Sequence, residues 1–451
     1  MRATQSRGLR HGVRRPTRLV PLVFLAAIFV GTALLMLPIS RAGAGGAPPL
    51  VALFTATSAV AVTGLVTVDT QTYWSGFGQG IILLLLQIGG FGIMTAATLL
   101  GLATGRGFRL SSRIITQVER GRLETNDALV VLKLVFFGTL SIEACIAALL
   151  TGRFYLGYGM NLSQAIWSGV FHAVSAFNNA GFSLYSDSLM AFQSDGMILA
   201  PIMLAVILTA LGFPVLQELR VRWRAPRRWS LHTKITLLGT GILLLGGTGA
   251  ILAAEWNNAA TLGPMSWSGK IGNAAFHSVV ARTAGFNSVD VGSFRIETLM
   301  VHYLLMFIGG GSAGTAGGIK VTTFFLLGMV AWSEVRGRED ATIFGRRIGR
   351  HIERQALTVA LLSVTLIATG TMILLAVTHF PLSDVLFETI SAFATVGLST
   401  GITPRLPASG QFVIIVLMFV GRIGTITVAS ALAMSHEHLS IRYPEERPIV
   451  G

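Results

Sequence analysis

Four short glycine motifs recur along this chain, and they constrain its fold more than any other feature. The motif glycines are residues 64, 181, 285 and 397, which places successive motifs 117, 104 and 112 residues apart. Each motif follows a short segment of apolar and small residues and precedes a polar one. The four motifs are Val62-Thr63-Gly64-Leu65, Asn179-Ala180-Gly181-Phe182, Thr283-Ala284-Gly285-Phe286 and Thr395-Val396-Gly397-Leu398. Four units of similar length, each contributing one glycine loop, predict a single site built by fourfold internal repetition.

The composition places these units in a membrane. Hydrophobic residues make up 52% of the chain and charged residues only 12%, whereas about a quarter of a soluble domain is charged. Uncharged apolar runs such as 197–216 and 357–377 are long enough to cross a bilayer, which takes about 20 helical residues. The lone cysteine, Cys145, lies inside an apolar run. It excludes a disulfide framework and a thiolate metal site, and we expect it to be a small packing residue.

The basic residues report topology. The net charge is +14, and most of the 34 lysines and arginines lie near the chain ends or in three polar segments within 106–122, 220–234 and 336–354. The positive-inside rule therefore predicts that both termini and these three segments are cytoplasmic and that the glycine motifs face outward. Binding of anionic membrane lipid is a second use of such charge. A nucleic-acid partner is not expected.

Each unit repeats one pattern of apolar segments. In the first unit, 19–37 is long enough to span, 50–61 is too short to span and suits a re-entrant helix, and 78–102 returns. We interpret 19–37 as a retained helix rather than a signal peptide, because it completes the first repeat. The sequence predicts an all-α polytopic membrane protein with four tandem helix, re-entrant pore helix with loop, helix repeats around one central pore. This arrangement gives eight spanning helices and four half-helices.

The repeats divide the chain as follows. We expect repeats at 19–105, 128–218, 233–333 and 355–435. The remaining segments are a basic N-terminus at 1–18, cytoplasmic loops at 106–127, 219–232 and 334–354, and a tail at 436–451.

The glycine loops are candidate ion-binding elements. Non-helical backbone at membrane depth is tolerated only where it is buried in protein or lines a water-filled cavity. Four converging loops would present rings of backbone carbonyls that replace the hydration shell of a monovalent cation, and glycine allows neighbouring carbonyls to point the same way. Three carboxylates follow the motifs and predict a cation-attracting outer mouth: Asp69, Asp187 and Asp290. The alternative is four outer hairpins with ordinary turn glycines.

The third returning run is interrupted by small residues. The interruption reads Gly309, Gly310, Gly311, Ser312, Ala313, Gly314, Thr315, Ala316, Gly317, Gly318. It predicts a broken helix whose backbone lies across a cavity. A helix-packing seam is the alternative. A nucleotide-binding loop is disfavoured, because no strand precedes the glycines.

Several charged residues lie within apolar segments. Arg422 is in the middle of the last run, and an intramembrane charge is by default a functional hypothesis, with a buried carboxylate partner as the alternative. We expect Lys320 to extend toward the cytoplasmic side and Arg282 to brace its loop through hydrogen bonds. Structural hydrogen bonding is favoured over ion attraction for three carboxylates, and over metal binding for two histidines: Glu143, Glu255, Glu388, His172 and His277.

The motifs resemble those of a known family. Thr-Gly-Leu, Asn-Asn-Ala-Gly-Phe-Ser and Arg-Thr-Ala-Gly-Phe-Asn are similar to the motifs of the Trk/Ktr/HKT (TrkH/KtrB) superfamily of potassium transporters. The resemblance covers residues 19–434 and is greater to KtrB-type members, because no extra helix pair precedes the first repeat. It implies a homodimer with one K⁺ pore per subunit, whose filter is made of the sixteen motif residues. It further implies a gate loop at 309–318 and Arg422 at the constriction beneath the filter.

The resemblance also implies partners and selectivity. Family members associate with a cytoplasmic ring of KtrA/TrkA-like RCK subunits, through which ATP or ADP acts, and no cofactor is covalently bound. Glycine in all four loops is typical of potassium-selective members, and the implied location is the bacterial cytoplasmic membrane. A Na⁺ or mixed Na⁺/K⁺ conductor and a coupled K⁺ symporter remain open. A secondary transporter with inverted repeats is disfavoured because the repeats run parallel, and an enzyme is disfavoured because no catalytic constellation appears.

Overall fold

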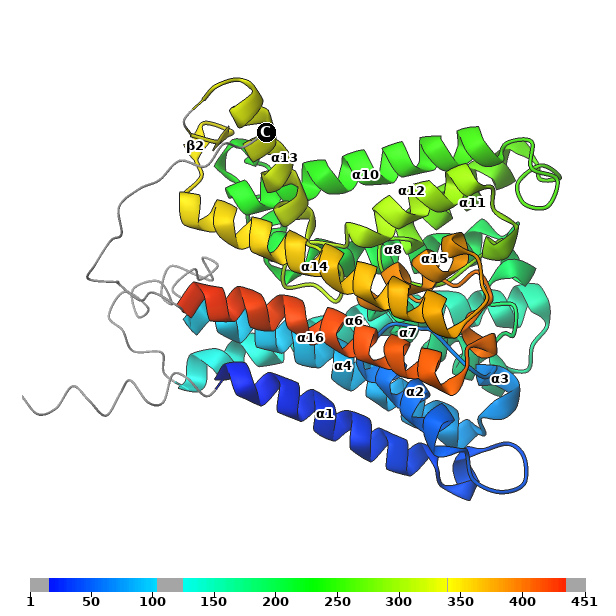
Figure 1. Ribbon diagram of the computed structural model, residues 1–451. Coiled ribbons are helices and arrows are strands. Elements are labelled where there is room, and N and C mark those ends of the chain that lie inside the picture. Colours follow the sequence, from blue (N-terminus) through cyan, green and yellow to red (C-terminus); the bar gives the residue numbers. More distant parts are fainter. Residues whose placement is uncertain (1–15, 104–124, 339, 435–451) are drawn as a thin grey trace, which may run out of the picture.

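The computed structural model describes residues 16–103, 125–338 and 340–434. Most of the expected N-terminal segment 1–18, most of the loop at 106–127 and the whole tail at 436–451 therefore lie outside the described residues. The described part is almost entirely helical, with a two-stranded hairpin of β1 (Thr342–Ile343) and β2 (Arg346–Arg347). Figure 1 shows the long helices running side by side, with the hairpin near one end of the bundle.

The helices follow the order expected from the repeats. The first and second units contain α1 (Pro16–Leu35), α2 (Pro49–Val60), α3 (Thr70–Tyr73), α4 (Gly76–Ala103), α6 (Thr125–Tyr158), α7 (Leu162–Phe177), α8 (Gly196–Leu211) and α9 (Phe213–Arg222). The third and fourth contain α10 (Leu231–Glu255), α11 (Trp267–Val280), α12 (Ile296–Phe307), α13 (Val321–Val335), α14 (Arg350–Val377), α15 (Leu382–Phe393) and α16 (Ala408–Met434). Short 3₁₀ helices are η1 (Pro38–Ser40), η2 (Met190–Phe192), η3 (Pro226–Arg228), η4 (Val291–Ser293) and η5 (Thr403–Arg405).

The half-length helix of the first unit, α2, lies within one residue of the expected 50–61, and α7, α11 and α15 hold the corresponding places in the other units. The starts of α7 and α11 use side-chain caps: Asn161 accepts a hydrogen bond from the Gln164 amide at 2.8 Å, and Ser266 accepts one from the Gly269 amide at 3.3 Å. Such caps satisfy amides that would otherwise lack partners at a helix start. Each helix carries one fully buried phenylalanine toward the bundle centre: Phe54, Phe171, Phe276 and Phe387.

The sequence predicts eight spanning helices, of which the third returning one is broken at 309–318. Within the described residues, four helices are long and apolar enough to cross a membrane alone, or five spans if α8 and α9 count as one broken span. The four are Gly76–Thr95, Val135–Tyr158, Leu231–Glu255 and Arg350–Val377. Shorter apolar stretches in the other outer helices are Val20–Leu35, Ile296–Phe307, Val321–Val335 and Ala408–Gly424.

The expectation of one continuous helix over 197–216 is wrong. The chain bends by 94° between α8 and α9. Gly212 at the bend has φ +86°, and a Cβ on it would lie 2.4 Å from the Ser312 carbonyl oxygen. Pro214 then starts α9 without needing an amide hydrogen bond. The bend therefore exists because the second unit's returning helix abuts the glycine-rich segment of the third.

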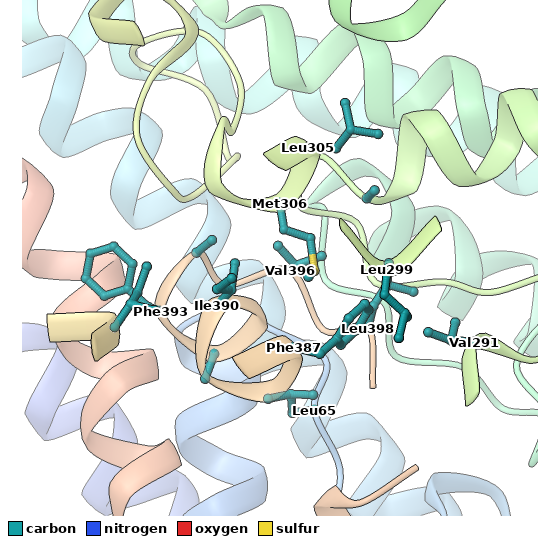
Figure 2. Close-up of a cluster of buried hydrophobic side chains, with 14 of the residues drawn as sticks. Leu65, Val291, Leu299, Leu305, Met306, Phe387, Ile390, Phe393, Val396 and Leu398 are labelled. Carbon is teal, nitrogen blue, oxygen red and sulfur yellow. The ribbon is translucent and has the colours of Figure 1, made fainter. Parts of the chain in front are cut away.

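The core packs the units against one another. Figure 2 shows Phe387 and Leu398 of the fourth unit beside Leu299 and Met306 of α12, with Leu65 of the first unit in the same cluster. The outer faces of the long helices expose apolar side chains. Cys145 is exposed on α6, so its expected role as a packing residue is wrong.

Candidate functional site

The four glycine motifs meet in a closed ring. A Cβ built on Gly64 would lie 2.2 Å from the carbonyl oxygen of Ala180 in the second unit, and one on Gly181 would lie 2.7 Å from that of Ala284 in the third. A Cβ on Gly285 would lie 2.5 Å from the carbonyl oxygen of Val396 in the fourth unit, and one on Gly397 would lie 2.0 Å from that of Thr63 in the first. Each motif glycine therefore lies against the carbonyl of the residue that precedes the motif glycine of the next unit. The fourth unit contacts the first in the same way, so the four motifs form a closed ring.

The ring backbone alternates between left-handed and ordinary conformations. All four glycines have positive φ, from +69° to +96°. The residues two positions earlier share this conformation although they carry side chains: Val62 at 55°, Asn179 at 58°, Thr283 at 91° and Thr395 at 50°. Non-glycine residues rarely adopt positive φ, and such strain clusters at functional sites. The same pattern of positive φ angles occurs in four separate units.

Serines at the ends of three half-helices hold the ring. The Gly64 amide donates to Ser58 Oγ at 3.1 Å, and the Gly397 amide donates to Ser391 Oγ at 3.1 Å. In the second unit, Ser175 Oγ donates to the Phe182 carbonyl at 2.7 Å. These bonds tie each loop to the rigid helix that precedes it.

The third unit lacks this support. Its phenylalanine is nine residues before the motif glycine, against ten elsewhere, so Val279 occupies the position of the serine. The nearby Ser278 donates instead to the Leu244 carbonyl of α10 at 2.9 Å. The third loop is therefore held to its own half-helix by backbone alone, with the Ala284 and Gly285 amides donating to the Val280 carbonyl at 2.9 and 3.4 Å.

A cavity of about 330 Å³ opens on one side of the ring, and its lining includes all four motif glycines and the three expected carboxylates. Asp69 Oδ2 accepts from Thr72 Oγ1 at 2.9 Å and from Ser186 Oγ of the second unit. Asp290 caps η4 and accepts from Ser293 Oγ at 2.6 Å, and Asp187 is exposed. The structure thus brings the predicted mouth residues together.

The glycine-rich segment lies on the other side of the ring, as a loop between α12 and α13. The two ends of the loop, which we call its neck, are joined by backbone hydrogen bonds. The Gly309 amide donates to the Ile319 carbonyl at 2.9 Å, and the Val321 amide donates to the Gly310 carbonyl at 3.0 Å. A Cβ on Gly317 would lie 2.1 Å from Thr395 Oγ1. The loop therefore lies against the fourth glycine motif at Thr395 and is no simple packing seam between helices.

Arg422 holds this loop in place. Its guanidinium is 3% exposed and donates to the Thr315 carbonyl. The ion pairs found among the described residues lie elsewhere, so the alternative of a carboxylate partner for Arg422 is not seen there. Lys320 Nζ donates to the Ala316 carbonyl. We expected this side chain to extend toward the cytoplasmic side, and it turns back to a carbonyl of the loop instead.

Arg282 makes an unexpected contact. We expected it to brace its own filter loop. Its Nη2 instead donates to the Gly309 carbonyl at the loop neck, at 3.0 Å. Two buried arginines from different units thus bind carbonyls near both ends of one loop.

The buried acids and histidines are held by polar neighbours. Glu143 accepts from Gln87 at 3.1 Å and from Asn178 at 3.3 Å. Glu388 accepts from Ser399 and Thr403, and Glu255 from Thr298, Thr261 and Asn258. His172 Nε2 lies 3.0 Å from Ser183 Oγ, and His277 Nε2 accepts from the Ser288 amide. No cluster of potential metal ligands occurs among the described residues.

The sequence interpretation missed two features of the site. Gln87 of α4 and Asn178, three residues before Gly181, join Glu143 in one network behind the second loop. Thr209 of α8 donates to Asn179 at 2.9 Å. The available signal was Asn178 itself, a polar residue where the first and fourth units have alanine.

Comparison with known proteins gives this arrangement a family. The TrkH family, described as a cation transport protein, matches residues 24–441. The chain belongs to the TrkH family. It is therefore a multi-pass membrane transport protein rather than an enzyme.

Individual relatives cover the TrkH-family chain almost end to end. It is similar to Ktr system potassium uptake protein B of Bacillus subtilis, with 39% identity over 97% of both chains, and to that of Vibrio alginolyticus, with 36% identity over 96% of this chain and 94% of the relative. The potassium/sodium uptake protein NtpJ of Enterococcus hirae is 34% identical over 97% of both. The crystal structure of the potassium transporter TrkH from Vibrio parahaemolyticus has the same fold, with a TM-score of 0.72 at 18% identity, over 92% of this chain and 84% of that one.

Proposed function

We propose that this chain is the pore-forming subunit of a potassium uptake system and that K⁺ passes through the ring of the four glycine loops. The closed order of the glycine contacts carries the proposal, because it aligns four strained backbone segments around one point. Backbone carbonyls arranged in this way replace the hydration shell of a monovalent cation. Similarity to proteins named potassium uptake proteins supports K⁺ as the ion.

Glycine at all four positions favours K⁺ over Na⁺. The relative named a potassium/sodium uptake protein keeps a Na⁺ or mixed Na⁺/K⁺ conductor as the second candidate. A coupled K⁺ symporter is a further candidate. Measurements of K⁺ flux distinguish a conductor from a symporter. Flux through a conductor follows the K⁺ gradient alone, whereas a symporter also needs a gradient of its coupling ion.

The glycine-rich segment 309–318 acts as a gate loop in this proposal. It lies beneath the fourth filter loop, and Arg422 adds a buried positive charge beside it. A fixed positive charge near a narrow path opposes a cation most strongly where little water screens it. Displacing the loop from Arg422 would both widen the path and let the guanidinium turn away.

Control would come from the cytoplasm. Both termini and the basic loops face it under the positive-inside rule, in the bacterial cytoplasmic membrane. These surfaces would dock a KtrA/TrkA-like ring of RCK subunits, which bring ATP or ADP, while the chain itself holds no covalent cofactor. Three relatives are named as proteins of a "Ktr system", which supports a multicomponent assembly. We further propose a homodimer with one pore in each subunit.

K⁺ and Na⁺ flux into proteoliposomes tests the function, with wild type compared with Gly285→Ser. A side chain at Gly285 meets the Val396 carbonyl and requires an unfavourable φ of +69°, so K⁺ selectivity should fall. Gly272→Ser on α11 is the matched control, because nothing lies within 4 Å of its Cβ position. Unchanged selectivity in Gly285→Ser would remove the ring as the selective site.

A further inference from the structure

We propose that Arg282 is a positioning residue that couples the third filter loop to the gate loop, so that movement of the gate changes ion selection. The inference rests on the proposed function and adds a connection between its two parts. It concerns one hydrogen bond between a residue three positions before the filter glycine and the first glycine of the gate loop.

The geometry ties Arg282 to both loops. Its backbone continues from α11 into the filter, with its amide donating to the Val279 carbonyl at 3.2 Å. Its side chain is 2% exposed and reaches Gly309. Gly309 in turn closes the gate-loop neck through its bond to Ile319. A shift of that neck therefore moves the acceptor of a side chain that belongs to the filter.

The charge of Arg282 makes this bond strong. The ion pairs among the described residues do not include Arg282. The Gly309 carbonyl follows the C-terminal end of α12, where unpaired carbonyls carry partial negative charge. Hydrogen bonds to ionised donors are about twice as strong as neutral ones, and a buried charge that loses its partner is costly. The guanidinium must therefore follow the carbonyl or keep only its longer hydrogen bond to Thr240 Oγ1 of α10, at 3.5 Å.

Among the four units, the third has the side chain next to its filter motif that contacts the gate loop. The corresponding position is Ala61 in the first unit and Ala394 in the fourth, and Asn178 in the second is bound to Gln87 and Glu143 on long helices. The third filter loop also lacks the serine brace of the others. Apart from backbone hydrogen bonds to the end of α11, the side-chain contact next to this motif is made with the loop proposed to move.

Coupling of this kind is reciprocal, because any change in the gate that favours one filter state must be matched by the reverse effect. Loosening the neck should change selectivity, and releasing Arg282 should change gate opening. A purely local brace for the third filter loop would give neither cross-effect.

A double-mutant cycle in proteoliposomes tests the coupling. Arg282→Gln removes the charge, and Gly309→Ala displaces the neck because its Cβ would lie 1.9 Å from the Gly317 carbonyl. Each single variant should lower the K⁺/Na⁺ flux ratio by about tenfold, as for the loss of one charge-assisted hydrogen bond. The double variant should be no less selective than either single one, and Arg282→Lys should restore part of the selectivity.

Gly311→Ala is the matched gate variant. Its Cβ would lie 2.5 Å from the Leu211 carbonyl, on the side of the loop next to α8. It should change K⁺ flux and leave the K⁺/Na⁺ ratio within twofold of wild type. Melting temperature and monodispersity of each purified variant separate a selectivity change from a folding defect.

Multiplicative effects of Arg282→Gln and Gly309→Ala, or a Gly309→Ala variant with normal selectivity, would overturn the coupling. Both results leave the proposed function intact if wild type selects K⁺. A wild type that carries no K⁺ would remove the proposed function instead, so the two failures are distinguishable.

Discussion

Each of the four units contributes the same pair of left-handed residues to the ring, whereas among the described residues the glycine-rich loop next to the ring comes from the third unit alone. Under the proposed function, the ring is nearly fourfold because its carbonyls would act together on one ion. The loop would have no such requirement, since one segment is enough to obstruct a path. In this proposal, internal repetition serves selection and the departure of one repeat serves control.

The two regions are also supported differently. Three ring loops are tied by serines to their own half-helices. The gate loop is held by side chains and backbone from other elements, including Arg282, Arg422 and the α8 end at Ala210. A segment held from outside can be released by moving its neighbours without disturbing its own helices.

The largest effect should come from the symmetric region. Replacing either Gly64 or Gly397 by alanine puts a Cβ within 2.2 Å of a neighbouring carbonyl and strains the backbone. About 3 kcal/mol of strain would lower K⁺ flux by ~100-fold. Proteoliposome K⁺ uptake measures this loss, and full activity of either variant would break the equivalence of the four units.

The next effect should come from the gate and have the opposite sign. Arg422→Gln removes a charged donor to the Thr315 carbonyl, worth about 1.5–3 kcal/mol. K⁺ flux without the cytoplasmic partner should therefore rise by roughly tenfold. Gly246→Ala in α10, where a Cβ meets nothing within 4 Å, is the control. A loss of flux in Arg422→Gln would mean that the arginine assists conduction rather than restraining the loop.

A smaller effect should appear in protein stability behind the second loop. Glu143→Leu removes the acceptor of the Gln87 side-chain amide, whereas Asn178 keeps its bonds to Gln87 Oε1 and the Val174 carbonyl. Unpaired buried donors cost about 1–3 kcal/mol, so the thermal unfolding midpoint in detergent should fall. The thermal unfolding midpoint of Glu143→Gln should fall less than that of Glu143→Leu. Equal midpoints for Glu143→Leu and wild type would show that the network does not stabilise this loop.

The smallest effect is expected at the mouth. Asp187→Asn removes one exposed carboxylate from the outer cavity, which should raise the K⁺ concentration for half-maximal uptake by about twofold at low ionic strength. The difference should disappear at 1 M ionic strength, where the Debye length is only about 3 Å. A shift that persists in high salt would instead indicate direct ion binding by Asp187.

The sequence predicted the repeats because each unit repeats a local signal: an apolar segment of half length, then a glycine. The half-helices and the break at 309–318 followed from such signals. Contacts between units left no comparable signal. The 94° bend depends on Ser312 lying against Gly212, and the Arg282 bond depends on Gly309 from a later helix. Lys320 and Cys145 were misplaced for the same reason, since the direction of a side chain is decided by distant neighbours.

The central claim is that the ion is selected by carbonyls from all four units. The most direct measurement is anomalous diffraction from crystals soaked in Tl⁺, a heavy cation close to K⁺ in size. The account predicts a peak on the axis of the ring, at similar distances from the carbonyls of Thr63, Ala180, Ala284 and Val396. Tl⁺ peaks confined to positions away from these four carbonyls would contradict it.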